Sequence, residues 1–265
     1  RRFVEDLERP DTEALDAIEF GALLHNVLEC ATRDDGLRLE TAPERIEQQF
    51  ADLLSQCSSD RFGSKRPTRI RVQERMLRRR LSAFAIVEAE SRQSGWFTHE
   101  VEWSFRRGLS FGDSGEQQQI VGRIDRIDRH VETGRVRVLD YKSGEAGASP
   151  VSSHRVRDAS GGWRWIDLQL PIYRHFFGEA TGVPPDQIDV GYASIPRSIR
   201  DTRIVVASDW GQADFADAIQ TAREVVAAIH RREFASSGSP WADEYANLCS
   251  MPGTPREMVQ EGRAR

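Results

Sequence analysis

The sequence is poor in cysteine and has no long apolar run. Its three cysteines, Cys30, Cys57 and Cys249, are far apart and form no C-x-x-C pair, which argues against a disulfide framework and a local zinc site. No stretch approaches the roughly 18 uninterrupted apolar residues of a membrane helix, and no basic-then-apolar secretory signal opens the chain. We therefore expect free thiols in a soluble, cytoplasmic protein with no membrane partner.

Lysine is almost absent as well. Of 37 basic residues, 35 are arginine and only Lys65 and Lys142 are lysine. Arginine therefore serves wherever a generic positive charge is sufficient. An arginine stays protonated, whereas a lysine ammonium is a compact charge whose pKa can fall, as a proton-transfer role requires. Lys142 is thus a candidate for chemistry, and a structural Asp–Lys pair is the alternative.

Neither sign of charge is in large excess. The formal net charge is −5 and the pI is about 5.8, so no global basic field marks the chain as a nucleic-acid binder. One segment departs from this balance, with nine basic residues: Arg61, Lys65, Arg66, Arg69, Arg71, Arg75, Arg78, Arg79 and Arg80. We interpret Arg71, Arg75, Arg78 and Arg79 as contacts to a phosphate backbone; a solvated helix face is the alternative.

Hydrophobic periodicity predicts both helices and strands, and the fold that we expect is α/β, with a central mixed β-sheet flanked by helices. Spacings of three and four predict helices at residues 11–32, 43–54, 68–92, 166–180 and 214–232. Alternation predicts strands at residues 99–105, 119–128, 136–142, 187–195 and 202–207, with a hairpin turn at Thr133-Gly134. Residues 58–63, residues 149–163 and the tail after Ser236 are expected to be irregular.

Two segments, GRIDRID (122–128) and VLDYKSG (138–144), carry the candidate chemistry. Because side chains alternate across a strand, Asp140 and Lys142 share one face. If the turn pairs residue 132 with 135, position 125 lies opposite 142, and Asp125 joins that face while Asp128 points away. A slip of one residue would exchange the two. Two converging carboxylates suit Mg²⁺ or Mn²⁺, which lowers the pKa of bound water.

With these segments the chain resembles the PD-(D/E)xK nuclease superfamily, and within it the RecB-like branch found at the ends of bacterial helicase–nuclease subunits. Further motifs agree with the resemblance. A G-x-x-x-H pattern ends at His25, an E-x-x-F pattern starts at Glu102, and a Q-x-x-x-Y pattern joins Gln169 to Tyr173. The i, i+4 spacing puts Gln169 and Tyr173 on one helix face. Together the motifs span roughly residues 20 to 175.

The resemblance implies a restriction-endonuclease-like fold and a role for each motif residue. His25, Asp125, Asp140 and the backbone carbonyl of Tyr141 would bind Mg²⁺ or Mn²⁺, and Lys142 would orient the attacking water. Gln169 and Tyr173 would support the site or contact the phosphate, and Glu102, rather than Glu100, would be the catalytic glutamate. The alternatives are a packed core histidine at His25 and an exposed strand carboxylate at Glu102. Arg123 and Arg126 either contact phosphate or cover a surface.

The implied function is a metal-dependent DNA nuclease, an exonuclease acting on a duplex end or a single strand, with a helicase domain or subunit as a partner. Residues 1–240 would form one RecB-like nuclease domain (core 12–235, helical part 12–92), and residues 241–265 an irregular tail. No initiator methionine is present, so we expect a segment of a longer polypeptide. Only Cys249 lies where relatives cluster three cysteines, so no iron–sulfur cluster is expected. An inactive scaffold module and a small-substrate phosphoesterase are the alternatives.

Overall fold

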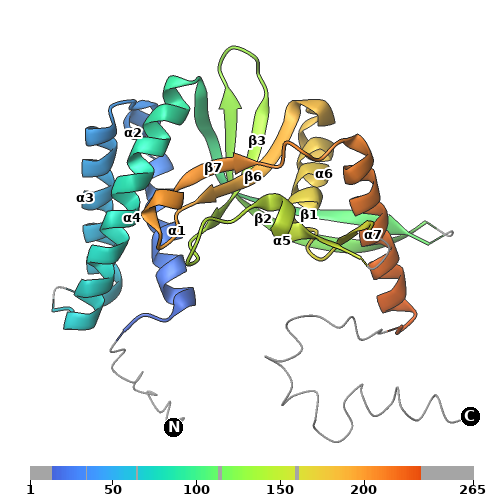
Figure 1. Cartoon of the computed structure of the whole chain (residues 1–265), viewed down its shortest axis with the longest axis horizontal. Coiled ribbons are helices and arrows are strands. Elements are labelled where there is room, and N and C mark those ends of the chain that lie inside the picture. The colour runs from blue at the N-terminus through green and yellow to red at the C-terminus, as the bar shows by residue number, and fades with distance from the viewer. Residues whose placement is uncertain (1–13, 34, 64, 113–114, 159–160, 234–265) are drawn as a thin grey trace, which may run out of the picture. The chain divides into compact units, whose positions relative to one another are not determined.

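The computed structural model describes residues 14–33, 35–63, 65–112, 115–158 and 161–233 (Figure 1). They belong to two compact units, one formed by residues up to 107 together with 119–219, the other by 108–118 and residues from 220 onward. The main helices are α1 (Ala17–Arg33), α2 (Asp35–Leu39), α3 (Pro43–Phe62), α4 (Thr68–Gln93), α5 (Pro150–His154), α6 (Gln169–Thr181) and α7 (Gln212–His230). No helix in the described ranges is long and apolar enough to cross a membrane.

The central element is a five-stranded mixed sheet in the order β1-β2-β3-β6-β7. Its strands are β1 (Trp96–Phe111), β2 (Glu116–His130), β3 (Val136–Lys142), β6 (Ile188–Ser194) and β7 (Arg203–Val206). The β2–β3 and β6–β7 pairs are antiparallel, whereas β3 and β6 are parallel. The predicted α/β fold with a mixed sheet flanked by helices is confirmed.

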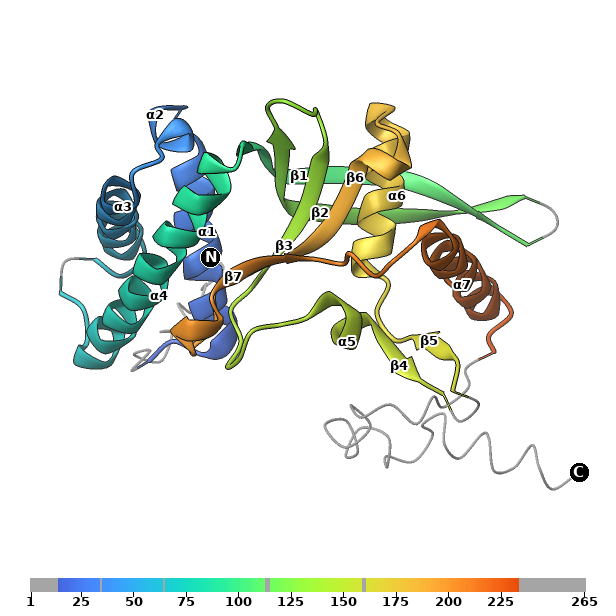
Figure 2. The same cartoon turned by 45° about the horizontal axis from the view of Figure 1, so that its top comes forward.

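The helices pack on the sheet through alternate residues of its inner strands. Leu139 and Tyr141 of β3 join one apolar core with α1, α3 and α4, which form a helical layer (Figure 2). The intervening residues of β3 face the other way, where α6 contacts β3 and β6. This alternation separates a dry face from a face that carries Asp140 and Lys142.

Some predicted boundaries differ from the structure for local reasons. Helix α1 begins at Ala17, because Asp16 accepts the Glu19 N–H at 2.8 Å while Glu19 accepts the Asp16 N–H at 3.2 Å, a reciprocal capping box. The start expected near residue 11 lies outside the described residues. Helix α3 continues through the predicted break at 58–63 as far as Phe62, since Ser58 is buried and not solvated as its polarity suggested.

The stretch 149–163 was predicted to be irregular, and that prediction is wrong. It contains α5 and β4 (Arg155–Arg157), and β4 pairs with β5 (Trp163–Trp165) in a separate two-stranded sheet. Strands of three residues are too short to show alternation, so their pattern could not be read. The tail predicted at 241–265 lies outside the described residues, and the single domain over 1–240 stays a prediction.

The expected register between β2 and β3 is wrong by two residues. The structure pairs Arg126 with Leu139 and Asp128 with Arg137, so position 125 is level with 140 and not with 142. The connection is a loop of four residues closed by the His130 N–H to Arg135 O hydrogen bond, and the His130 ring accepts the N–H groups of residues 132 and 133. A shift of two residues leaves every side chain on its expected face.

Asp128 accordingly faces away from Asp125 and into a buried ion network. Its two carboxylate oxygens accept Arg126 Nε at 2.6 Å and Arg137 Nε at 2.7 Å, and Arg126 also pairs with Glu88 of α4. Arg126 is 1% exposed, so it neither contacts phosphate nor covers a surface. The network joins α4 to the sheet through charges that neutralise one another.

We predict that Asp128→Asn lowers the free energy of unfolding by about 3–5 kcal/mol, because it leaves Arg137 buried without its paired carboxylate and removes one of the two carboxylates paired with Arg126. Burial opposes ionisation of Asp128, but Arg126 and Arg137 outweigh it and lower its pKa. A lowered folded-state pKa contributes stability above the unfolded value of about 3.9, and this contribution is lost as the pH falls through the folded value. Urea unfolding should therefore show a large difference from wild type at neutral pH that shrinks in acid, whereas the exposed Asp209→Asn changes little.

Candidate active site

The candidate site lies where β2 separates from β3. The ladder between these strands covers residues 126–129 and 136–139, whereas β3 stays paired with β6 through Lys142. Past the ladder, the Tyr141 N–H donates to Asp125 Oδ2 at 2.9 Å in place of a backbone acceptor on β2. This fork leaves room between the strands for side chains from other elements.

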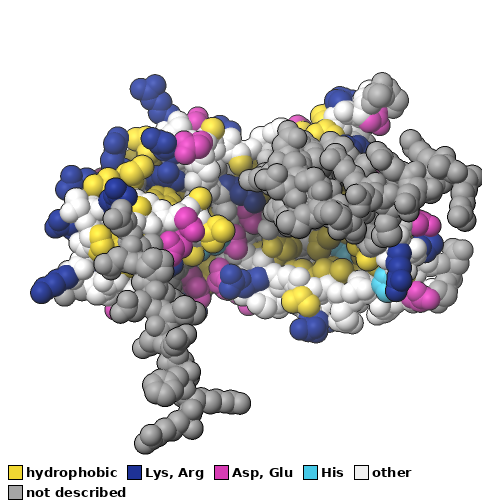
Figure 3. Space-filling model, turned by 90° about the horizontal axis from the view of Figure 1, so that it is seen from below, with side chains coloured by type: hydrophobic (Ala, Val, Ile, Leu, Met, Phe, Trp, Pro, Cys, Tyr) yellow, Lys and Arg dark blue, Asp and Glu magenta, His cyan; other side chains and the backbone are white. Residues whose placement is uncertain are grey.

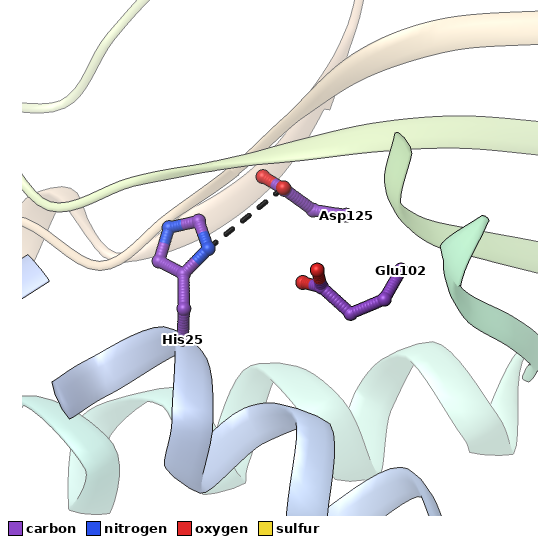
Figure 4. A group of neighbouring side chains, drawn as sticks. All are labelled: His25, Glu102 and Asp125. Atoms are coloured by element: carbon purple, nitrogen blue, oxygen red, sulfur yellow. Dashed lines mark ion pairs between the residues drawn. The ribbon is translucent and has the colours of Figure 1, made fainter. Parts of the chain in front are cut away.

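Three side chains from different elements converge in the fork. His25 of α1, Glu102 of β1 and Asp125 of β2 each offer a ligand atom, and these atoms lie within 4.8 Å of one another. Figure 4 shows the three side chains pointing toward a common point, with His25 Nδ1 3.8 Å from Asp125 Oδ1. The His25 ring packs edge-on against Tyr141 at 5.4 Å, which fixes its direction. One nitrogen and several oxygens form the donor set.

The backbone of Glu102 has an unusual conformation that directs its side chain to this point. Its φ is 53°, a left-handed conformation that is rare for a residue with a side chain. Its carboxylate also pairs with Arg123 Nε at 2.7 Å, so Arg123 meets a site carboxylate. The strained conformation turns Glu102 out of the regular alternation of β1, and such strain is characteristic of functional sites.

The three groups have shifted pKa values. Burial raises the pKa of Asp125 to about 6, and the negative charge of Asp140 adds to the effect. Burial also raises the pKa of Glu102, against the opposing charge of Arg123. Burial lowers the pKa of His25, so its imidazole is neutral at pH 7, the form that can bind a metal. The carboxylates therefore repel one another in a partly dry site, a cost that a bound cation would remove.

Asp140 and Lys142 form a second cluster beside the first. Lys142 Nζ lies 2.8 Å from Asp140 Oδ2, and Gln169 Nε2 donates to Asp140 Oδ1 at 2.8 Å. The Gln169 Nε2 group also lies 3.1 Å from the Tyr173 hydroxyl, so the motif residues of α6 reach the strand. Asp140, an expected metal ligand, is held here by Lys142 and Gln169, and Tyr141 contributes its N–H group to Asp125.

Sequence reasoning missed the support beneath Lys142. Tyr192 of β6 is the parallel partner of Asp140, and its ring centroid lies 4.9 Å from Lys142 Nζ. The Tyr192 hydroxyl is 2.7 Å from His154 Nε2, and His154 Nδ1 is 2.9 Å from Asp167 O, just before α6. Tyr192 lies near Lys142 because the chain crosses over between β3 and β6 and returns parallel to β3. No pattern within a short stretch of sequence could therefore have identified Tyr192 and His154.

Two motifs are linked by close packing behind the site. A Cβ at Gly122 would lie 2.4 Å from Cζ of Phe105, so glycine is required for the ring to lie on β2. The Phe105 ring also meets Tyr173 edge-on at 6.1 Å. The glycine of the GRIDRID segment and the phenylalanine of the E-x-x-F pattern are therefore one packing unit that supports Glu102 and Tyr173.

The predicted phosphate-contacting arginines lie on the outer part of the helical layer. Arg71, Arg75, Arg78 and Arg79 are all exposed on α4. The first three line a cavity of about 230 Å³ together with Arg66, Glu74 and residues of α3. Figure 3 shows basic side chains gathered on this part of the surface, interspersed with apolar ones. Further along α4, Arg80 donates to Ser143 O at 2.8 Å, so the helix runs from this surface to the end of β3.

Comparison with known proteins agrees with these motifs. The sequence profile of the PD-(D/E)XK nuclease superfamily matches residues 1–253. A curated relative, an ATP-dependent helicase/deoxyribonuclease subunit from Carboxydothermus hydrogenoformans, is 27% identical over 187 residues, which are 62% of this chain but only 16% of that protein. A solved structure from Eubacterium rectale, described as a candidate exonuclease, gives a TM-score of 0.41 at 12% identity over 74% of this chain and 70% of that one. The last likeness is too low to identify a fold.

We predict that Glu102→Gly is more stable to unfolding than Glu102→Ala by about 1 kcal/mol, because only glycine adopts a positive φ without strain. Within an ordinary strand the order is reversed, since glycine loses more backbone entropy. The same two substitutions at Ser104, on the same strand and without a positive φ, provide the matched control. Urea denaturation compares the four variants, and an identical order at both positions would contradict the strained backbone.

Proposed function

Because the chain belongs to the PD-(D/E)XK nuclease superfamily, we propose that it is a Mg²⁺- or Mn²⁺-dependent deoxyribonuclease that hydrolyses phosphodiester bonds. The observation that carries this proposal is the convergence of His25, Glu102 and Asp125 in one fork of the sheet, beside the Asp140–Lys142 pair. Such a donor set can hold a divalent ion that activates water, and the neighbouring lysine can position that water for attack.

The residues present fit a divalent metal. Carboxylate oxygens are the ligands that Mg²⁺ and Mn²⁺ prefer, and a neutral imidazole completes the donor set. Burial and neighbouring carboxylates raise the pKa values of Asp125 and Glu102, and a divalent cation would relieve this repulsion. His25, Glu102 and Asp125 would hold the ion, with Asp140 and the carbonyl oxygen of Tyr141 as the further ligands suggested by the family pattern.

A bound ion would lower the pKa of the attacking water and neutralise charge on the phosphate. Lys142 would donate a hydrogen bond to that water and hold it for in-line attack on phosphorus. As the new phosphorus–oxygen bond forms, the bond to the 3′-oxygen would break, that oxygen would take up a proton from solvent, and the product would carry a 5′-phosphate. Asp140 and Gln169 hold the Lys142 ammonium in place, while the Tyr192 ring below it restricts its motion. Tyr173 reaches the phosphate or steadies Gln169.

We further propose an exonuclease that works within a helicase–nuclease, with residues 1–240 as its RecB-like nuclease domain. The name of the Carboxydothermus hydrogenoformans relative supports a helicase partner, and the small share of that protein covered leaves room for one. DNA would enter along α4, where the exposed arginines would contact the phosphate backbone. A duplex end or a single strand would then reach the fork.

We predict that Lys142→Ala reduces DNA cleavage by about 10²-fold, because the attacking water loses the group that holds it in line with the phosphate. Lys65→Ala, which removes the one other lysine, should leave cleavage unchanged. The assay follows radiolabelled DNA with Mg²⁺, Mn²⁺ or EDTA, and Asp125→Asn and EDTA should each abolish the reaction.

The choice of DNA separates the alternatives. Digestion of linear but not of covalently closed DNA indicates an exonuclease. Cleavage that persists in EDTA or in the Lys142→Ala variant would contradict the metal- and lysine-dependent mechanism. DNA binding without cleavage under every metal condition would instead favour the inactive scaffold module.

We predict that replacing Arg71, Arg75 and Arg78 together by glutamine flattens the salt dependence of DNA binding. Each lost phosphate contact should reduce the slope of log K against log salt by about 0.9 on a duplex or about 0.7 on a single strand. The exposed Arg106, Arg107 and Arg129, changed in the same way, form a control of equal charge. Fluorescence anisotropy across a salt series measures both sets, and equal slopes would rule out α4 as the phosphate surface.

A further inference from the structure

The small sheet after α5 carries alternating arginine and tryptophan side chains on one face. Arg155 of β4 is level with Trp165 of β5, and Arg157 is level with Trp163 (Figure 2 shows the two strands). The inner end is firmly held. Arg155 lies about 5 Å from three tryptophan rings and pairs with Asp214, and Trp165 Nε1 donates to Asp217 at 2.9 Å.

The outer end of this ladder is open to solvent. Trp163 is 44% exposed, and of the five tryptophans within the described ranges it is the one exposed. Tryptophan is highly buried on average, so an exposed indole on a braced hairpin requires an explanation. Arg157 covers part of the ring at 4.0 Å and is tethered there by a hydrogen bond to Gly161 O. An aromatic surface with a cation beside it is thus held in a fixed place.

This end of the hairpin is close to the candidate active site along the chain. Gln169 follows Trp163 by six positions, so their Cα atoms lie at most about 20 Å apart even if the chain between them is fully extended. The connection is also ordered, because Ile166 N donates to His154 O at 2.8 Å and Gln169 N donates to Asp167 Oδ1 at 2.7 Å. The hairpin is therefore positioned relative to the residues that hold Asp140 and Lys142.

We propose that Trp163 is a stacking site for an unpaired nucleobase of the strand that enters the fork, with Arg157 contacting a flanking phosphate. Residues 155–165 contain three arginines and one aspartate, a balance that suits a polyanion. Bases stack on exposed aromatic rings whatever their sequence, and arginine supports both stacking and phosphate contact. The inference rests on the proposed nuclease function and specifies its substrate near the site as unpaired nucleic acid.

The test measures binding without cleavage, using the full chain as the Lys142→Ala variant in EDTA. Two fluorescent probes of equal length and charge are compared, an oligothymidylate and the same backbone with abasic sites. The parent variant should bind the oligothymidylate about tenfold more tightly than the abasic probe. Adding Trp163→Ala should remove that difference, Trp163→Phe should keep most of it, and Ile166→Ala, which removes an exposed apolar residue of the same connection, should keep all of it.

Equal losses for both probes with Trp163→Ala, or the same loss with Ile166→Ala, would overturn the inference. If the alanine variant unfolds on circular dichroism, Trp163→Leu replaces it, since leucine keeps the apolar bulk without an aromatic face. Because no step depends on hydrolysis, base-dependent binding by a chain that never cleaves DNA would leave the stacking site standing while the nuclease proposal failed. Cleavage without base-dependent binding would support the nuclease proposal and overturn the stacking site.

Discussion

The hydrogen bond from the Tyr141 N–H to Asp125 is the interaction on which the candidate site depends. A strand that leaves its partner exposes backbone groups, and in a buried place each unpaired group is costly. Here a side chain of the departing strand takes the place of the missing backbone acceptor. The same carboxylate is thereby brought to the mouth of the fork with its second oxygen facing His25. One carboxylate therefore both satisfies the backbone of β3 where the ladder ends and supplies an oxygen to the candidate site.

The site gives up stability that the rest of the fold supplies. Glu102 is held at a positive φ and Asp125 is buried beside other carboxylates, and both features lower the stability of the folded state. The packing of Phe105 on Gly122 and the apolar layer of α1, α3 and α4 hold these groups in place. A preorganised cluster of repelling oxygens is useful only if a cation completes it, which is why strain and crowding at this place favour a metal-dependent reaction.

Alternation and helical spacing predicted the strands of the central sheet, the bounds of β6 and β7 to within a residue, and the face shared by Asp125, Asp140 and Lys142. The register failed because the His130 ring binds two N–H groups of the turn, an interaction that alternation does not encode. That face was correct nonetheless, because an error of two residues preserves it. Tyr192 and His154 could not be predicted beneath Lys142, since their proximity depends on a parallel pairing across some 50 residues of sequence.

The buried ions around Asp128 also have a consequence for folding. A ladder of four residue pairs is short enough to form in more than one alignment, and its sequence, with aspartates at 125 and 128, offers a competing wrong one. Slipping β2 by one residue would turn Arg126 and Asp128 together toward the fork, which would take Asp128 away from Arg137 and Arg126 away from Glu88 and leave their buried partners without counter-ions. The ion pairs of Arg126 and Arg137 thus stabilise the observed alignment of β2 and β3, in which Asp125, and not Asp128, faces the fork.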